Sequence, residues 1–249
     1  MRSLAFWGLL SFCLIPALLP SFLPLRARAP RDLALELAGS SSLVWAILFG
    51  LVIAIPQIDP RSLLLRAPSI GARPLGPQNL NARGFLGQFL VLALGTLILV
   101  LTEGLAPFVV ATWRPELAWG SAELTAILGG APWLLARGAV LLALARVLGA
   151  GLGRLLGGVA FLGLVCATRF AEGSATEGAY SWVWRSAAMF MPPLSLLETA
   201  GSAMGRAVAR VELALVAAGY ICAYNLLCGM ILGRRSGPFP PLDPPRGRA

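Results

Sequence analysis

The sequence predicts an all-α polytopic membrane protein with about six transmembrane helices, and two observations carry that prediction. Hydrophobic residues make up 57% of the 249 residues and charged residues only 12%, against about 25% charged residues in a typical globular domain. Six apolar runs also approach the length of ~20 residues that a helix needs to cross a bilayer. A soluble protein of this size could not bury so much apolar surface, so we expect the bilayer to be its solvent.

The first predicted span, residues 4–25, begins almost at Met1 and contains three prolines. Membrane helices tolerate proline where neighbouring helices satisfy the freed carbonyls. A cleaved signal peptide is the alternative, because residues 27–29 match a cleavage pattern, but the apolar run exceeds the ~7–15 residues of a signal. The other predicted spans follow at residues 41–58, 85–102, 124–148, 152–167 and 211–232.

Two segments do not fit the pattern of a clean span. Residues 182–202 mix tryptophan, Arg185 and prolines with apolar residues, which favours an interfacial helical segment between the fifth and sixth spans. Residues 236–249 are rich in proline and predict an extended cytoplasmic tail. The sequence therefore predicts a single transmembrane domain, residues 1–235, followed by this tail.

The distribution of arginine predicts the orientation of the spans. With the amino terminus in the cytoplasm, eleven arginines fall in inside segments and eight in outside segments, while Arg137 lies within the fourth span. Arginine is enriched in cytoplasmic loops, and Arg234 and Arg235 directly follow the last span. Both termini are therefore predicted to be cytoplasmic.

Missing residue types exclude several classes of chemistry. The chain has no histidine and no lysine, so it cannot form a histidine metal site, a Ser-His-Asp triad or the lysine-containing phosphate loop of a nucleotidase. The arginines stand at the ends of apolar runs and not on one polar face, which argues against nucleic-acid binding. We expect no enzymatic activity, cofactor or metal, and the lipid bilayer is an expected partner.

The longest predicted cytoplasmic connection, residues 59–84, carries four arginines and two short helical candidates. These are Pro60–Arg66 and Pro77–Arg83, the second having proline where a helix commonly starts. A short basic helix at the membrane surface could dock a partner. The alternative is a solvated loop whose arginines bind lipid headgroups.

Three short motifs resemble the permease subunit of an ABC transporter of the type-2 exporter class. Residues 72–75 read ARPL, and Arg83, Phe85, Leu86, Gly87 and Phe89 follow in the order that the family shows in its coupling helix. Residues 189–200 (MFMPPLSLLETA) and 223–237 (AYNLLCGMILGRRSG) resemble the family's carboxyl-terminal segments. Gln88 stands where the family has lysine, and the family's amino-terminal amphipathic helix is missing.

The resemblance implies a subunit of the bacterial inner membrane that pairs with itself or with a sister permease. A separate ABC ATPase subunit would drive export through the loop of residues 59–84. The implied coupling residues are Arg73, Pro74, Leu75, Gln78, Asn79, Asn81 and Arg83. The alternative function is a non-transporting structural or assembly subunit of a larger membrane complex, which the altered loop favours.

Polar residues inside apolar runs form a second set of candidates, as transport-pathway residues or helix contacts. They are Gln88, Arg137, Glu212, Tyr220, Tyr224 and Asn225. A charge at mid-bilayer costs at least ~2.5–3.5 kcal/mol, so Arg137 is expected to contact substrate or to pair with Glu103 or Glu212. Alternatively, the fourth span starts later and Arg137 lies near an interface.

Helical spacing adds two further expectations. Tyr220 and Tyr224 share a helix face, and such polar groups usually form hydrogen bonds between helices. Gly149, Gly153 and Gly157 indicate either a tight turn between the fourth and fifth spans or a close helix contact.

Overall fold

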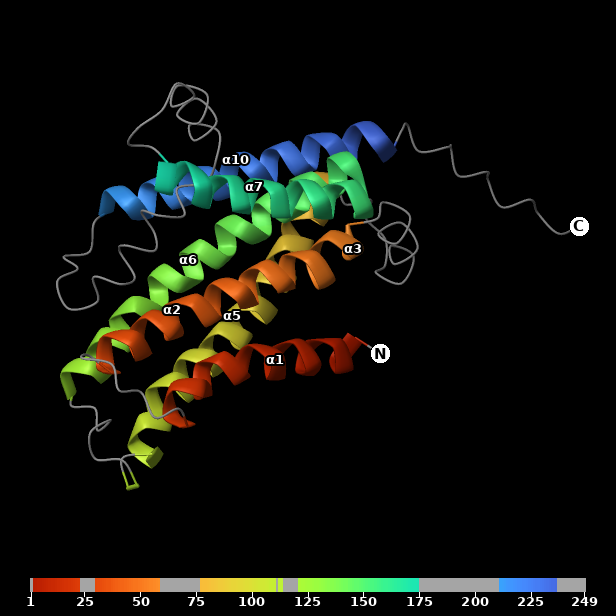
Figure 1. The fold of residues 1–249 in the computed structure, drawn as a ribbon. Coiled ribbons are helices and arrows are strands. Elements are labelled where there is room, and N and C mark those ends of the chain that lie inside the picture. Colours follow the sequence, from red (N-terminus) through yellow and green to blue (C-terminus); the bar gives the residue numbers. More distant parts are fainter. Residues whose placement is uncertain are drawn as a thin grey trace, which may run out of the picture.

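In the computed structural model, long helices pack side by side into a bundle (Figure 1). The structure describes residues 2–22, 30–58, 77–110, 112–113, 121–174 and 211–236. In chain order the helices are α1 (Arg2–Phe22), α2 (Pro30–Phe49), the π-helix η1 (Gly50–Ala54), α3 (Ile55–Gln57), α5 (Pro77–Val110), α6 (Ser121–Leu152), α7 (Arg154–Ser174) and α10 (Val211–Ser236). The all-α fold class is therefore confirmed.

Four helical segments in these ranges are long and apolar enough to cross a membrane. They are Ser40–Gln57, Asn81–Leu105, Leu128–Leu152 and Leu213–Arg234, and they correspond to the predicted second, third, fourth and sixth spans. The predicted first and fifth spans contain shorter apolar helices, Leu4–Ile15 and Arg154–Thr168. The chain is thus a multi-pass membrane protein. Residues 182–202 and the tail beyond Ser236 lie outside the described residues.

The second span changes its helical pitch before it ends. The Ile55 N–H bonds to the Gly50 carbonyl, five residues back, so η1 is a wider turn between α2 and α3. This turn comes directly before Pro56, which has no N–H to donate to the preceding turn. Single π-turns of this kind are frequent at functional sites, and this one lies one turn before Gln57.

The bundle core is centred on Trp45 of α2, which is fully buried. Its indole Nε1 donates to the main-chain oxygen of Leu92 at 3.2 Å, and its ring packs edge-on against Phe6 of α1. The opposing residue of α5 is Gly95, where an added Cβ would collide with the indole ring. Absence of a side chain therefore lets α2 and α5 approach closely, as small residues do in membrane bundles.

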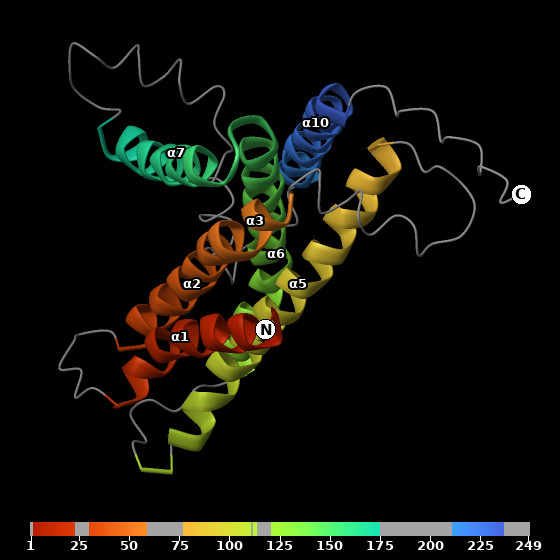
Figure 2. The same cartoon turned by 90° about the vertical axis from the view of Figure 1, so that its right-hand side faces the viewer.

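A tight turn joins α6 to α7, as one of the two glycine interpretations predicted. Gly153, between the two helices, has a φ of 81°, a left-handed conformation that glycine adopts without steric cost. Close contact also occurs, because a Cβ on Gly157 would lie 2.8 Å from the Leu148 carbonyl oxygen. From this turn α7 leaves the bundle at a wide angle to α6 (Figure 2).

Both described ends of the chain lie at one end of the bundle, which we name the terminal end. Here α1 and α5 begin, and α3, α6 and α10 finish (Figure 1). Ile58, directly after α3, packs in one apolar cluster with Leu232 of α10, and residues at the start of α1 surround one cavity with Gln57 and Arg83. Loop 59–76 therefore leaves from, and returns to, the same end as α10.

Candidate functional site

Arg146 lies near the terminal end of α6 and is 2% exposed. Its guanidinium donates three hydrogen bonds to α5. Nη1 donates to Gln88 Oε1, and Nη2 donates to Asn81 Oδ1 at 2.7 Å and to the Asn81 main-chain oxygen at 3.1 Å. Arginine keeps its charge in proteins, so a buried cation joins α6 to the first turns of α5.

The network continues from α5 to two more helices. Asn81 Nδ2 donates to the main-chain oxygen of Asn225 in α10 at 2.9 Å. Gln88 Nε2 donates to Gln57 Oε1 in α3 at 3.3 Å. We name Gln57, Asn81, Gln88, Arg146 and Asn225 the Arg146 cluster. These five residues bring α3, α5, α6 and α10 together at the terminal end.

Local packing explains how a guanidinium fits between these helices. Gly84 of α5 faces Arg146, and a Cβ there would lie 3.2 Å from Nη2. On the other side, the Cys228 thiol of α10 donates to the Arg146 main-chain oxygen at 3.7 Å. Two buried atoms of this cluster, Arg146 Nε and Asn225 Oδ1, have no hydrogen-bond partner among the described residues. The cluster is therefore only partly satisfied, and such networks are sensitive to small displacements.

A second buried network surrounds Arg137, which is 1% exposed. Its Nη2 donates to Ser42 Oγ of α2 at 2.7 Å. The adjacent Ser41 donates to the carboxylate of Glu103, on α5, which is also buried. We name these four residues the Arg137 cluster. The predicted ion pair of Arg137 with Glu103 stays a prediction, and the two side chains contact the neighbouring residues Ser42 and Ser41.

The two other interpretations of Arg137 have different outcomes. The side chain of Glu212 lies outside the described residues, although its backbone belongs to α10. The fourth span does start later than the predicted residue 124, at Leu128, but apolar turns of α6 still lie on both sides of Arg137. Protein side chains bury this charge.

The predicted coupling residues fall into three groups. Arg73, Pro74 and Leu75 lie outside the described residues, as do the side chains of Gln78 and Asn79. Arg83 is exposed at the terminal end. Asn81 is 3% exposed and bonds to Arg146 and Asn225, so its side chain faces the interior and is not on a surface that a partner could contact.

The predicted short helix Pro77–Arg83 requires a correction. A helix does begin at Pro77, but it continues without a break to Val110 as α5. The glycines at 84 and 87 do not end it, because isolated glycines weaken a helix by only about 1 kcal/mol each. The segment that resembles a coupling helix is therefore the first part of a transmembrane helix.

The polar residues of α10 confirm one prediction and modify another. Tyr220 and Tyr224 share a face, with ring centroids 5.7 Å apart, and they pack against Val140 of α6. The Asn225 side chain instead donates to the Ile221 carbonyl of its own helix at 2.9 Å. The Asn225 main-chain oxygen, not its amide group, is thus the acceptor between helices.

Sequence reasoning missed the centre of the Arg146 cluster. Arg146 is one of the eleven arginines of the predicted inside segments, and the sequence pattern indicates no further role for it or for Gln57. A signal was present on α5: Asn81 and Gln88 are seven residues apart, so both amides project from one helix face. Two amides on one face of an apolar helix indicate a buried polar partner, but the pattern does not identify which helix supplies it.

Known proteins give no further guide to this chain. No protein-family model matches it, and no curated protein or solved structure matches it. In the ranges that the structure describes, no three histidine, cysteine, aspartate or glutamate side chains are grouped so that they could hold a metal ion.

Proposed function

We propose that this chain is the membrane permease subunit of an ATP-driven ABC exporter, paired with itself or with a sister permease. A separate ATPase subunit would dock at the terminal end, on the loop of residues 59–84. The sequence resemblance of residues 72–89 supports this function. The carrying observation is the Arg146 cluster, because it ties the helix that starts in this segment to three other spans.

The geometry suggests how a movement of the loop would reach the bundle. A displacement of the first turns of α5 acts on Asn81, and Asn81 holds both Arg146 of α6 and the Asn225 carbonyl of α10. Hydrogen bonds to a charged group contribute about 1.5–3 kcal/mol each. The helices therefore either move with α5 or lose these bonds. In this proposal the Arg146 cluster transmits ATP-driven movement to α6 and α10.

The substitution of glutamine for the family's lysine has a structural rationale in this proposal. Gln88 Oε1 accepts a hydrogen bond from Arg146, which a lysine ammonium cannot do because it has donors only. A lysine would also place a second positive charge beside the buried guanidinium. Gln88 and Arg146 are therefore compatible as a pair.

The finer localisation belongs to the same proposal: a bacterial inner membrane, with both termini in the cytoplasm. The excess of arginine in the predicted inside segments supports this orientation. The fold is compatible with it, because α1 begins and α10 finishes at the same end. A cytoplasmic ATPase can reach Arg83 only in this orientation, so the docking experiment below also tests the topology.

The test is recovery of the ATPase. The tagged full chain is extracted from its native membrane in mild detergent, and co-purifying proteins are identified by mass spectrometry. We expect an ABC ATPase subunit with a nucleotide-binding phosphate loop. Arg83→Glu should release most of it, because the reversed charge stands on the exposed start of α5.

Arg234→Glu is the matched control. Arg234 is exposed and lies in the last turn of α10 at the same end of the bundle, so this variant makes the same charge change away from the docking loop. It should keep the ATPase. Recovery of other membrane proteins without any nucleotide-binding partner would refute the exporter and favour a structural or assembly subunit.

A further inference from the structure

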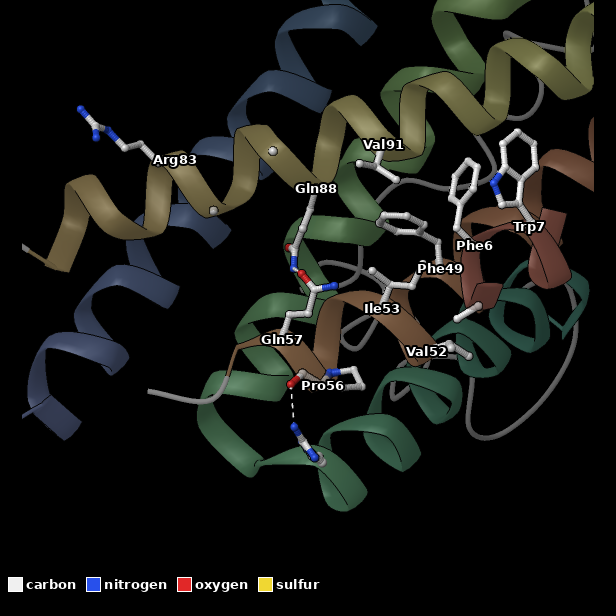
Figure 3. Close-up of a pocket in the computed structure, with 14 residues that line it drawn as sticks. Phe6, Trp7, Phe49, Val52, Ile53, Pro56, Gln57, Arg83, Gln88 and Val91 are labelled. Carbon is white, nitrogen blue, oxygen red and sulfur yellow. Dashed lines mark hydrogen bonds between the residues drawn. The ribbon is translucent and has the colours of Figure 1, made fainter. Parts of the chain in front are cut away.

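A groove opens at the terminal end between α1, α5 and the turn formed by η1 and α3 (Figure 3). Its volume is about 720 Å³, within the ~300–1,000 Å³ that is usual for ligand pockets. Its walls are mainly apolar and aromatic, formed by Phe6, Trp7, Phe49, Val52, Ile53 and Val91. Gln57 and Gln88, two members of the Arg146 cluster, also line it.

The groove has a polar rim on one side only. Gln57, Arg83 and Arg154 line this rim. Gln57 is the last residue of one span, Arg83 stands at the start of another, and Arg154 follows directly after a third. All three therefore lie at the level where the hydrocarbon of a bilayer meets its headgroups.

Both charged residues of the lining are arginines. Figure 3 shows the Arg83 guanidinium extended away from the apolar wall, at the outer edge of the groove. Arg154 is exposed and donates to the Pro56 carbonyl oxygen at 2.9 Å, which anchors it beside the mouth. Because Arg83 points away, Arg154 is the positive charge beside the mouth that can bind an anion.

The groove is open on its α5 side because of Gly87. A Cβ added there would meet no atom within 4 Å. Val52 and Trp7, on the opposing walls, are 47% and 57% exposed at the bundle surface. A molecule in the surrounding bilayer can therefore reach the groove from the side.

We propose that this groove binds one anionic phospholipid of the surrounding leaflet. Its phosphate would bind at Arg154 beside the mouth, and one acyl chain would follow the wall toward Val91. Arg83 and Val91 are separated by about 12 Å along α5, at 1.5 Å per residue. That depth approaches the ~15 Å hydrocarbon thickness of one leaflet.

The lining favours a lipid over a soluble phosphate compound, because its polar residues lie at the headgroup level and its apolar wall extends from there toward the middle of the bilayer. A soluble anion would be recognised by Arg154 but would leave the apolar wall without an occupant. A zwitterionic lipid would fill the wall but would bring a positive charge to a mouth that is already positive. Only an anionic amphiphile complements both parts of the groove.

The test measures retained lipid on the purified full chain by native mass spectrometry. The protein is exchanged into detergent with equal amounts of phosphatidylglycerol and phosphatidylcholine. We expect phosphatidylglycerol to be retained preferentially. Gly87→Leu should abolish that preference, because its side chain enters the open groove without a backbone clash. Arg154→Gln should weaken retention about fivefold, the usual effect of one basic residue near an anionic lipid surface.

Gly163→Leu is the matched control, since a Cβ on this exposed glycine of α7 also meets no atom within 4 Å and lies away from the groove. It should retain lipid as the unsubstituted chain does. Equal retention of the two lipids, or full retention by Gly87→Leu, would overturn the proposal. Displacement of the lipid by inorganic phosphate alone would assign the rim to a soluble anion and overturn it too. None of these measurements depends on an ATPase, so the exporter proposal and this one can fail separately.

Discussion

Two arginines of the same helix, α6, are buried by different means. Arg137 donates to Ser42, and the neighbouring Ser41 donates to the carboxyl group of Glu103, so its cluster contains a basic and an acidic side chain. The hydrogen bonds of the Arg146 guanidinium go to amide and main-chain oxygens of Gln88 and Asn81. No carboxyl group among the described residues bonds to it. The comparison therefore sets a network that includes an acidic side chain against one in which the arginine has only amide and main-chain acceptors.

This difference suggests different roles for the two networks. A buried charge of one sign with a nearby opposite charge is stabilised in place. A cation held only by amide dipoles, with its Nε unpartnered among the residues described, has weaker restraints. The Arg137 cluster then fixes how α2, α5 and α6 pack. The Arg146 cluster can change its partners when the start of α5 moves.

Removal of Arg146 should have the largest effect. Arg146→Met deletes three hydrogen bonds and leaves the oxygens of Gln88 and Asn81 buried without donors, so we expect a loss of roughly 3–5 kcal/mol in the free energy of unfolding. Thermal unfolding of the purified chain in detergent measures it. Arg234→Met, at an exposed position, should change stability by less than about 1 kcal/mol. If the two variants unfold alike, the cluster does not hold the helices together.

A charge introduced at position 88 should have the next largest effect. A positive charge and a negative charge there should change the free energy of unfolding differently. Gln88→Lys removes an acceptor and adds a cation beside Arg146, so we expect a loss of about 2–3 kcal/mol in the free energy of unfolding. Gln88→Glu supplies the missing carboxylate and should be neutral or stabilising. The same unfolding assay compares them. A stable lysine variant would show that Gln88 is not a partner of Arg146.

The fold was largely predictable because apolar length is a local property of the sequence. Four predicted spans match helices of membrane-spanning length within a few residues at each end. The break at Gly153 was also predictable, since the row of glycines at 149, 153 and 157, with Arg146 and Arg154 nearby, indicates a turn. The continuity of α5 was not predicted, because Pro77 and Gly84 suggested a short separate helix whereas packing extends the helix from Pro77 to Val110.

The candidate site was less predictable because its contacts join residues far apart in the chain. The sequence marks Asn81 as polar and near a basic loop, which suggested a surface role. Its burial against Arg146 and Asn225 depends on how α5 rotates about its axis within the bundle. Arg137 was recognised because its position in an apolar run is costly by itself. Arg146, near the end of a span, carried no such signal.

The smallest expected effect concerns the Arg137 cluster and the independence of the two networks. Ser42→Ala removes one hydrogen bond to Arg137, which keeps its other contacts, so we expect a loss of only about 1 kcal/mol in the free energy of unfolding. Arg137 and Arg146 are separated by about 13 Å along α6. Because sites farther apart than ~7–10 Å with no shared partner usually act additively, Ser42→Ala and Asn81→Ala should add within about 0.5 kcal/mol.

The matched pair for that measurement is Asn81→Ala with Gln88→Ala. Both side chains bond to the same guanidinium, so their effects should deviate clearly from additivity. The free energy of unfolding is measured for the three single variants, the two double variants and the unsubstituted chain, which completes both cycles. Strong coupling between Ser42 and Asn81 would mean that α6 moves as one rigid unit joining both networks. The transmission that we assign to the Arg146 cluster would then extend to the Arg137 cluster as well.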